Sequence, residues 1–97
     1  MELIFEWDKR KATANYRKHK VSFDEACTVF QDVNLLTFKD KVHSDDEERF
    51  ISIGTSFRSK VLLIIHTEQS EREQLIIRVI SCRKAIKAER RAYEEGK

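Results

Sequence analysis

The alternation of apolar and polar residues predicts an extended segment at the start of the chain, followed by helices. Leu3 to Trp7 is a short apolar run typical of a strand. Asp8 is a favourable N-cap, and we expect it to begin a helix over Lys9 to His19. Ala12 and Tyr16 are four residues apart and mark the side of this helix that we expect to face the core.

The second helix has a more specific signature. Ser22 and Glu25 form a capping box, in which each side chain accepts a hydrogen bond from the other residue's backbone N–H. An apolar stripe at i, i+3, i+4 and i+7 overlaps it, made of Phe23, Ala26, Cys27 and Phe30. This stripe predicts a helix with one face in the core.

After Gln31 the pattern becomes that of β-strands. Four strands are predicted, over Leu35–Phe38, Arg49–Thr55, Lys60–Thr67 and Glu73–Cys82. The last three are joined by turns short enough for antiparallel hairpins. A final helix is predicted over Lys84 to Glu95. The order β-α-α-β-β-β-β-α predicts an α+β fold, with a mostly antiparallel sheet of four to five strands, two N-terminal helices and one C-terminal helix.

Length and composition narrow the class of protein. We expect one domain over residues 1–97, because a second core would not fit in 97 residues. The longest apolar run, Val61 to Ile65, is far shorter than the roughly 20 residues of a membrane-spanning helix. The N-terminal residues also lack the pattern of a signal peptide. We therefore expect a soluble cytoplasmic protein.

Candidate metal ligands crowd one segment of the chain. His43 and the acidic run Asp45 to Glu48 offer nitrogen and oxygen ligands, but the sequence shows no second group of ligands elsewhere. We therefore favour a solvated turn and expect no metal. Because no glycine-rich nucleotide motif is present either, we expect no cofactor.

Metal-free cleavage of RNA requires no fixed spacing of residues. RNA carries its own nucleophile, the 2′-hydroxyl, and an enzyme supplies a base, an acid and cations that stabilise the phosphate. Six side chains suited to these tasks stand mostly at predicted strand ends: His43, Arg49, His66, Arg78, Arg83 and Tyr93. We treat these six as candidate catalytic residues.

Several candidates also have a structural interpretation. Arg78 is in phase with Ile76 and Ile80, and it requires an anionic partner that can be a phosphate or a carboxylate on the sheet. His66 can be a buried core residue. Tyr93 can simply pack against the sheet.

The predicted last helix carries a basic stripe at i, i+3 and i+7, formed by Lys84, Lys87 and Arg91. This stripe either binds RNA phosphate or remains solvated. Arg78 and Arg83 are five residues apart, so on a regular strand their side chains point to opposite faces. A bend, a bulge or the end of the strand near Ser81 is needed to bring both to one phosphate.

Three segments, in order along the chain, match a known family. The first comprises Phe5-Glu6-Trp7-Asp8, Lys11, Asn15, Lys18-His19 and Val21-Ser22-Phe23-Asp24-Glu25-Ala26. The second comprises His43-Ser44, Glu48-Arg49-Phe50 and Ile53-Gly54. The third comprises Ile77-Arg78-Val79-Ile80-Ser81, Arg83-Lys84-Ala85 and Glu89-Arg90-Arg91-Ala92-Tyr93-Glu94. Together these segments resemble the BrnT family of bacterial toxins.

The resemblance implies a RelE-like fold and a type II toxin, a ribonuclease that halts translation. It also implies a cognate antitoxin, BrnA, which neutralises the toxin and carries the DNA-binding domain, so that DNA is bound only indirectly. The six candidate catalytic residues are the positions that the resemblance places in the active site. The sequence departs from the family at Lys9, Lys20 and Ser59-Lys60, all in predicted turns.

A non-enzymatic RNA-binding or protein-interaction module is the alternative function. Both interpretations predict salt-sensitive RNA binding, and only a ribonuclease turns its substrate over. Direct DNA binding by this chain is a third and less favoured interpretation, because the sequence has no helix-turn-helix or ribbon signature. The predicted sheet has apolar residues in both phases, such as Ile76 and Ile77. Either a partner protein covers the face that the helices leave open, which we expect, or the helices and the long loop cover both faces.

Overall fold

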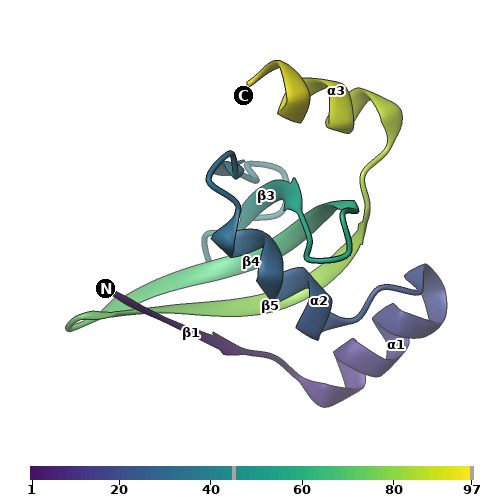
Figure 1. The fold of residues 1–97 in the computed structure, drawn as a ribbon. Helices are drawn as coiled ribbons and strands as arrows, with labels where there is room; N and C mark the ends of the chain where they lie inside the picture. The colour runs from purple at the N-terminus through teal and green to yellow at the C-terminus, as the bar shows by residue number, and fades with distance from the viewer. Residues whose placement is uncertain (45, 97) are drawn as a thin grey trace.

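The computed structural model describes residues 1–44 and 46–96, and its strands and helices follow the order that the sequence predicts (Figure 1). The elements are β1 (Glu2–Glu6), α1 (Lys9–His19), α2 (Phe23–Cys27), the 3-10 helix η1 (Thr28–Gln31), β2 (Leu36–Lys39), β3 (Phe50–Thr55), β4 (Val61–Glu71), β5 (Gln74–Lys84) and α3 (Lys87–Glu95). The predicted α+β fold class is confirmed. Among the described residues, no helix is long and apolar enough to cross a membrane.

The five strands form one sheet in the order β1-β5-β4-β3-β2. β1 runs parallel to β5, and every other neighbouring pair is antiparallel. β4 lies in the middle of the sheet, which agrees with its unbroken apolar run from Val61 to Ile65. The sheet is therefore mostly antiparallel, as predicted.

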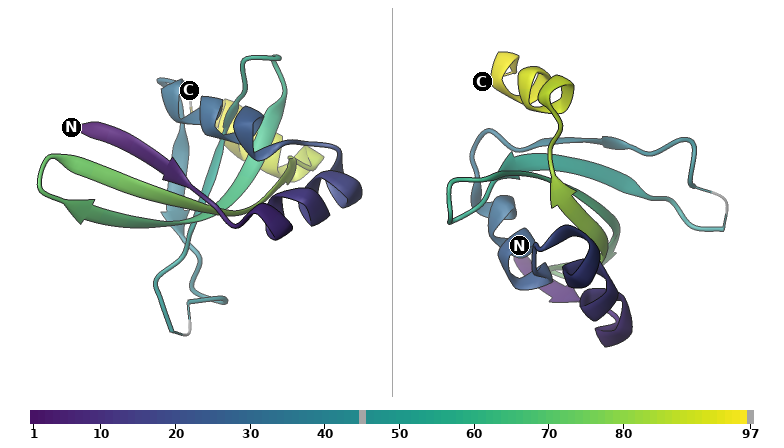
Figure 2. Two further views of the ribbon diagram at one scale, coloured as in Figure 1. Left: turned by 90° about the horizontal axis from the view of Figure 1, so that it is seen from below. Right: turned by 90° about the vertical axis from the view of Figure 1, so that its right-hand side faces the viewer.

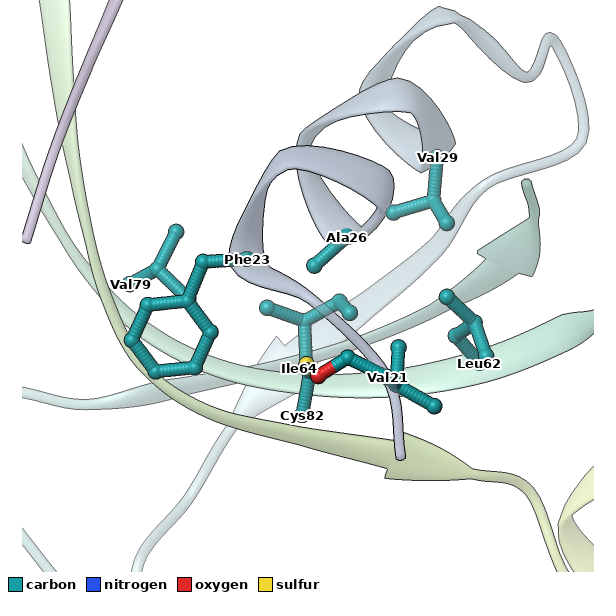
Figure 3. Close-up of a cluster of buried hydrophobic side chains, with 8 residues drawn as sticks. All are labelled: Val21, Phe23, Ala26, Val29, Leu62, Ile64, Val79 and Cys82. Carbon is teal, nitrogen blue, oxygen red and sulfur yellow. Dashed lines mark hydrogen bonds between the residues drawn. The ribbon is translucent and has the colours of Figure 1, made fainter. Parts of the chain in front are cut away.

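One face of the sheet is covered by α1, α2 and η1 (Figures 1 and 2), and we call it the helix-covered face. Its core is a cluster of buried side chains from the α1–α2 connection, the helical segments α2 and η1, β4 and β5: Val21, Phe23, Ala26, Val29, Leu62, Ile64, Val79 and Cys82 (Figure 3). The stripe predicted on the second helix contributes Phe23 and Ala26 to this core, and Cys27 and Phe30 pack against it.

The opposite face carries a smaller apolar cluster. Ile53, Leu63 and Tyr93 are buried there, and the partly buried Leu36, Ile51, Val61 and Ile65 pack against them. Tyr93 belongs to α3, which lies on the other side of the sheet from α1 and α2 (Figure 2). Because α3 is short, this face remains partly open, and we call it the groove face.

The last helix begins later than predicted. Lys84 is still part of β5, because the pairing with β4 continues to the bond from the backbone N–H of Ala85 to the carbonyl of Val61, at 2.9 Å. α3 begins only at Lys87. The predicted basic stripe is therefore divided between a strand and a helix.

The inner side of α1 also differs from the prediction. Ala12 packs against the core as expected, but Tyr16 is 52% exposed and Asn15 is buried instead. The Asn15 amide donates to the carbonyls of Val21 (3.3 Å) and Cys82 (2.9 Å), and its Oδ1 accepts from the Cys82 backbone N–H (3.1 Å). β1 pairs with β5 only as far as residue 78, so Asn15 supplies the hydrogen bonds that a neighbouring strand would otherwise make.

Replacing Asn15 with alanine is expected to lower the free energy of unfolding by about 2–4 kcal/mol, because several buried backbone groups then lose their partners. Urea denaturation of the two proteins measures the difference. Lys18→Ala on the exposed side of the same helix should change the value by less than about 0.5 kcal/mol. Similar effects in the two variants would show that Asn15 does not join α1 to β5.

Candidate active site

A β-bulge in β5 places Arg78 and Arg83 on the same face of the sheet. The register between β4 and β5 shifts between Ile65 and His66, so that Ile80 has no opposite residue. An extra residue of this kind reverses the alternation of the side chains that follow it. The irregularity that the spacing of the two arginines requires is therefore present, and it lies next to Ser81 as expected.

A groove of about 400 Å³ lies on this face, beside the start of α3. It is lined by Asp40, Val42, His43, Arg49, Ile51, Leu63, Ile65, Ile80, Ser81, Arg83 and Glu89. The groove brings together three of the six candidate catalytic residues, which are His43, Arg49 and Arg83. His43 and Arg49 come from the loop between β2 and β3, with Arg49 directly before β3, and Arg83 comes from the end of β5.

Arg49 has no side-chain partner among residues 1–44 and 46–96. Its backbone is held on both sides, because its N–H donates to Ser44 Oγ at 3.0 Å and its carbonyl accepts from the Asp40 N–H at 2.8 Å. Its Nε is buried without a hydrogen bond in this part of the chain. A buried guanidinium donor without a partner is unfavourable. An anion in the groove would give the Arg49 guanidinium a partner.

His43 is held by the buried carboxylate of Asp40. The distance between His43 Nδ1 and Asp40 Oδ2 is 3.0 Å, and Asp40 is 6% exposed while the His43 side chain is 66% exposed. A carboxylate that holds Nδ1 leaves Nε2 of the imidazole available to a ligand. Sequence reasoning missed Asp40. The only local signal was its spacing three residues before His43 at the end of a predicted strand.

Arg83 is paired with a carboxylate from α3. Its two terminal nitrogens donate to the two oxygens of Glu89, at 2.8 and 2.9 Å. The hydrogen bonds from Arg83 lower the pKa of Glu89, and the same bonds raise the pKa of Arg83, so both groups are charged. Glu89 also accepts from the backbone N–H of Ile86 and caps α3. The two terminal nitrogens of Arg83 are therefore already bonded to a carboxylate of the protein.

Arg78 lies beyond the groove and forms an ion pair with Glu47. Glu47 lines a second, smaller hollow together with Asp46, His43 and Arg49. His43 and Arg49 thus line both depressions. Arg78 is connected to the smaller one through its ion pair with Glu47. The ion pair is the structural interpretation that the sequence left open for Arg78.

His66 does not join this group. It lies on the helix-covered face with 0% exposure, between the rings of Phe30 and Phe50 at centroid distances of 5.1 and 5.9 Å. Its Nε2 lies 2.7 Å from Ser52 Oγ. Burial lowers its pKa to about 4, so the ring is neutral near pH 7. The structural interpretation of His66 as a core residue fits these contacts.

Tyr93 also lies away from the groove, although on the same face. Its ring is buried against β3, and its hydroxyl is bonded to Thr55 Oγ1 at 2.9 Å and to Asp32. Burial, followed by the bond to Asp32, raises the pKa of this phenol. These contacts anchor α3 on the sheet, which fits the packing interpretation.

The residues of the predicted basic stripe are all exposed, but they do not form one row. Lys84 lies opposite Leu62 in the sheet, in the strand phase of the helix-covered face. Lys87 and Arg91 lie on α3 and line a shallow surface depression together with Arg90. Asp45, one of the residues considered as metal ligands, lies outside the described residues. Within the described ranges, no cluster of three or more His, Cys, Asp or Glu side chains is placed to hold a metal ion.

The fold and the groove define a class of small α+β protein whose open sheet face carries an imidazole beside arginine side chains. The sequence model described as the ribonuclease toxin BrnT of type II toxin–antitoxin systems matches residues 7–89. The chain therefore belongs to the BrnT family of ribonuclease toxins, which confirms the family that the three sequence segments indicated.

A solved structure supports the same assignment. The crystal structure of the Brucella abortus ribonuclease toxin BrnT is similar to this chain with a TM-score of 0.64 and 25% sequence identity. The match covers 90% of this chain and 100% of the Brucella chain. No curated protein matches the sequence.

The environment of His66 predicts a dependence of stability on pH. Between about pH 6.5 and 4 an unfolded histidine binds a proton that the folded chain excludes, so stability should fall as pH falls, by up to about 1.4 kcal/mol per pH unit. Chemical denaturation at a series of pH values measures this slope. His66→Gln, which keeps a polar partner for Ser52, should have a shallower slope in the same window. Equal slopes would mean that His66 does not remain neutral on folding.

Proposed function

We propose that this protein is a metal-independent endoribonuclease, the toxin of a type II toxin–antitoxin module, and that it inhibits translation by cutting RNA. The observation that carries the proposal is Arg49, whose side chain has no partner among the described residues, beside the carboxylate-held His43 in one groove. A phosphodiester supplies an anion for this guanidinium. The 2′-hydroxyl of RNA supplies a proton for an imidazole to remove.

The side chains around the groove then take distinct roles. Arg49 binds the scissile phosphate and stabilises the additional charge on it in the transition state. Arg83 contributes a second guanidinium from the end of β5 once Glu89 releases it. His43 transfers a proton, and Arg78 contacts the chain of the RNA farther along β5. His66 and Tyr93 support the fold in this proposal.

The exposed cations Lys87 and Arg91 on α3, and Lys84 at the end of β5, would attract the RNA backbone. Their contribution is electrostatic and therefore decreases as salt increases. They need no fixed geometry for this purpose, which is consistent with their separation between a strand and a helix.

A cognate antitoxin of the BrnA type is the proposed partner, in a hetero-oligomer that contacts DNA only through the antitoxin. Exposed apolar side chains next to the groove support a protein partner on this face, since Phe38 is 44% exposed and Val42 is 78% exposed. An antitoxin bound here would also block access to His43. We place this activity in the cytoplasm, where the RNA substrate and the ribosome are found.

Purified protein should cleave RNA in the presence of a chelator. Arg49→Ala and Arg83→Ala should each lower kcat about 10²–10³-fold, because each removes a cation that stabilises the transition state. Arg72→Gln is the matched control, since it removes an equal charge at the tip of the β4–β5 hairpin, outside the groove.

The same experiment distinguishes a ribonuclease from the alternative function. Salt-sensitive RNA binding without cleavage, and no growth arrest on expression without the antitoxin, would indicate a non-enzymatic RNA-binding module. Full activity in folded Arg49→Ala and Arg83→Ala proteins would show that the groove is not the active site.

Glu89→Gln should increase affinity for RNA by up to about fivefold, because a neutral amide competes less than a carboxylate with phosphate for the Arg83 fork. Glutamine keeps an oxygen that can accept from Ile86 and cap α3. A 2′-O-methyl oligonucleotide, which lacks the nucleophile, is a suitable probe for fluorescence anisotropy. Glu94→Gln makes the same charge change on the exposed side of α3 and serves as the control. If both variants bind alike, Glu89 does not compete with the substrate.

A further inference from the structure

Asp40 is the buried carboxylate of the groove, and neither the sequence segments nor the family likeness assigns it a role. We propose that Asp40 is a positioning residue that holds the proton of neutral His43 on Nδ1. Nε2 then remains free to act as the general base toward the 2′-hydroxyl. This inference rests on the proposed function, because it specifies how the same groove removes a proton.

The backbone of the loop fixes where the Asp40 carboxylate lies. Its N–H donates to the carbonyl of Arg49 at 2.8 Å, which extends the pairing of β2 with β3 by one residue. Its carbonyl accepts from Ser44 Oγ at 2.5 Å. These two bonds close the loop between β2 and β3 at its base. They fix the positions of Asp40 and Arg49 relative to each other.

The two carboxylate oxygens have different tasks. Oδ1 accepts from the backbone N–H groups of Val42 (3.2 Å) and His43 (3.4 Å). Oδ2 faces His43 Nδ1 at 3.0 Å. Because Oδ1 is held by the loop, the carboxylate is oriented before any substrate binds. With 6% exposure, Asp40 also has little access to water that could replace the imidazole as its partner.

The chemistry of the pair selects one tautomer of histidine. An ionised carboxylate has no proton to donate, so Nδ1 must be the donor in this bond. The neutral ring then has its lone pair on Nε2. Other charged groups around the same groove and the adjoining hollow are Arg49, Arg83, Glu89, Asp46 and Glu47. Of the described residues, only Asp40 is bonded to the ring of His43.

The proposed step balances without a metal or a cofactor. The proton of the 2′-hydroxyl moves to Nε2 of His43, and the 2′-oxygen forms a bond to phosphorus. The bond from phosphorus to the 5′-oxygen breaks, and the leaving oxygen takes a proton from water. His43 then returns its proton to the hydroxide that remains. The products are a 2′,3′-cyclic phosphate and a 5′-hydroxyl, and Asp40 stays ionised throughout.

A role for Asp40 in closing the loop alone is the competing explanation, and Asp40→Asn separates the two. The Oδ1 of asparagine can still accept from the backbone N–H groups of Val42 and His43, so the loop keeps its hydrogen bonds. Its Nδ2 amide faces Nδ1 of the ring and donates to it. The variant therefore favours the tautomer with the proton on Nε2, which cannot accept the proton of the substrate.

The ring nitrogens can be observed directly by NMR with ¹⁵N-labelled histidine, on full-length protein at a pH where the ring is neutral. The signals of His43 are assigned by their loss in His43→Gln, since the chain has three histidines. We expect protonated Nδ1 and unprotonated Nε2 in the wild type, and the reverse in Asp40→Asn. A wild-type protein with its proton on Nε2 would overturn the inference.

Cleavage kinetics provide the second measurement. Asp40→Asn should lower kcat at least about 10²-fold with little change in KM, as expected for loss of a general base. Glu48→Gln removes a carboxylate charge from the same loop at a residue that pairs with Lys39 and lines neither depression, and it should keep its activity. Loss of kcat in Asp40→Asn without a change of tautomer would assign Asp40 to the loop alone and overturn the inference. A wild-type protein that shows the expected tautomer but does not cut RNA would instead refute the proposed function.

Discussion

The β-bulge at Ile80 keeps the buried apolar side chains of β5 on the helix-covered face and its arginine side chains on the groove face along the whole strand. Before the bulge, Ile77 and Val79 of β5 are buried, and after it the next buried residue is Cys82 rather than residue 81. Without the bulge, Arg83 would share a face with Ile77 and Val79, and its side chain would point into the core beneath the helices. Burying an unpaired guanidinium there would cost several kcal/mol, so the bulge is required by the core as much as by the groove.

The three arginines on the groove face differ in how they are neutralised. Arg83 and Arg78 are paired with Glu89 and Glu47, whereas Arg49 has no such partner in the described part of the chain. The pairs reduce the repulsion that adjacent cations on one small face would otherwise produce. The exception, Arg49, shares both depressions with His43, and a carboxylate there would compete with a phosphate. In the proposed function, this distribution of partners favours the binding of phosphate over the stability of the fold at Arg49.

The sequence predicted those features that depend on neighbours along the chain. The N-cap at Ser22, the helix after Asp8 and the order of the strands follow from local spacing, and all are present. The predicted capping box is only half formed, because Ser22 Oγ accepts from the Glu25 N–H at 3.0 Å while the Glu25 carboxylate accepts from Ser56 Oγ at 2.7 Å instead. The spacing of Arg78 and Arg83 required an irregularity in β5, although it could not say which residue is extra. The family resemblance was also available from the sequence, because its segments occur in order along nearly the whole chain.

What the sequence could not predict depends on contacts between distant segments. Asn15 is buried because β1 is too short to cover the edge of β5, which no pattern in α1 reveals. Lys84 stays in the sheet because β4 still pairs with β5 at that point, against the helical spacing of its sequence. His66 suited both a core and a catalytic role in the sequence, and only the fold shows that it lies buried on the helix-covered face, away from the groove. Asp40 meets His43 because the pairing of β2 with β3 closes their loop.

The small size of the chain explains why the groove face is open. Three helical segments cover one face of the sheet, and α3 alone reaches the other, anchored by Tyr93 at one end. A domain of this length buries only about two-thirds of the surface that its unfolded chain exposes. The uncovered part is therefore where a polymer can approach the strands, and where His43 and Arg49 are accessible. The exposed apolar side chains beside them make the same area unfavourable in water. In the proposed function, the opening that admits RNA is therefore also the surface on which a neutralising partner gains the most by binding.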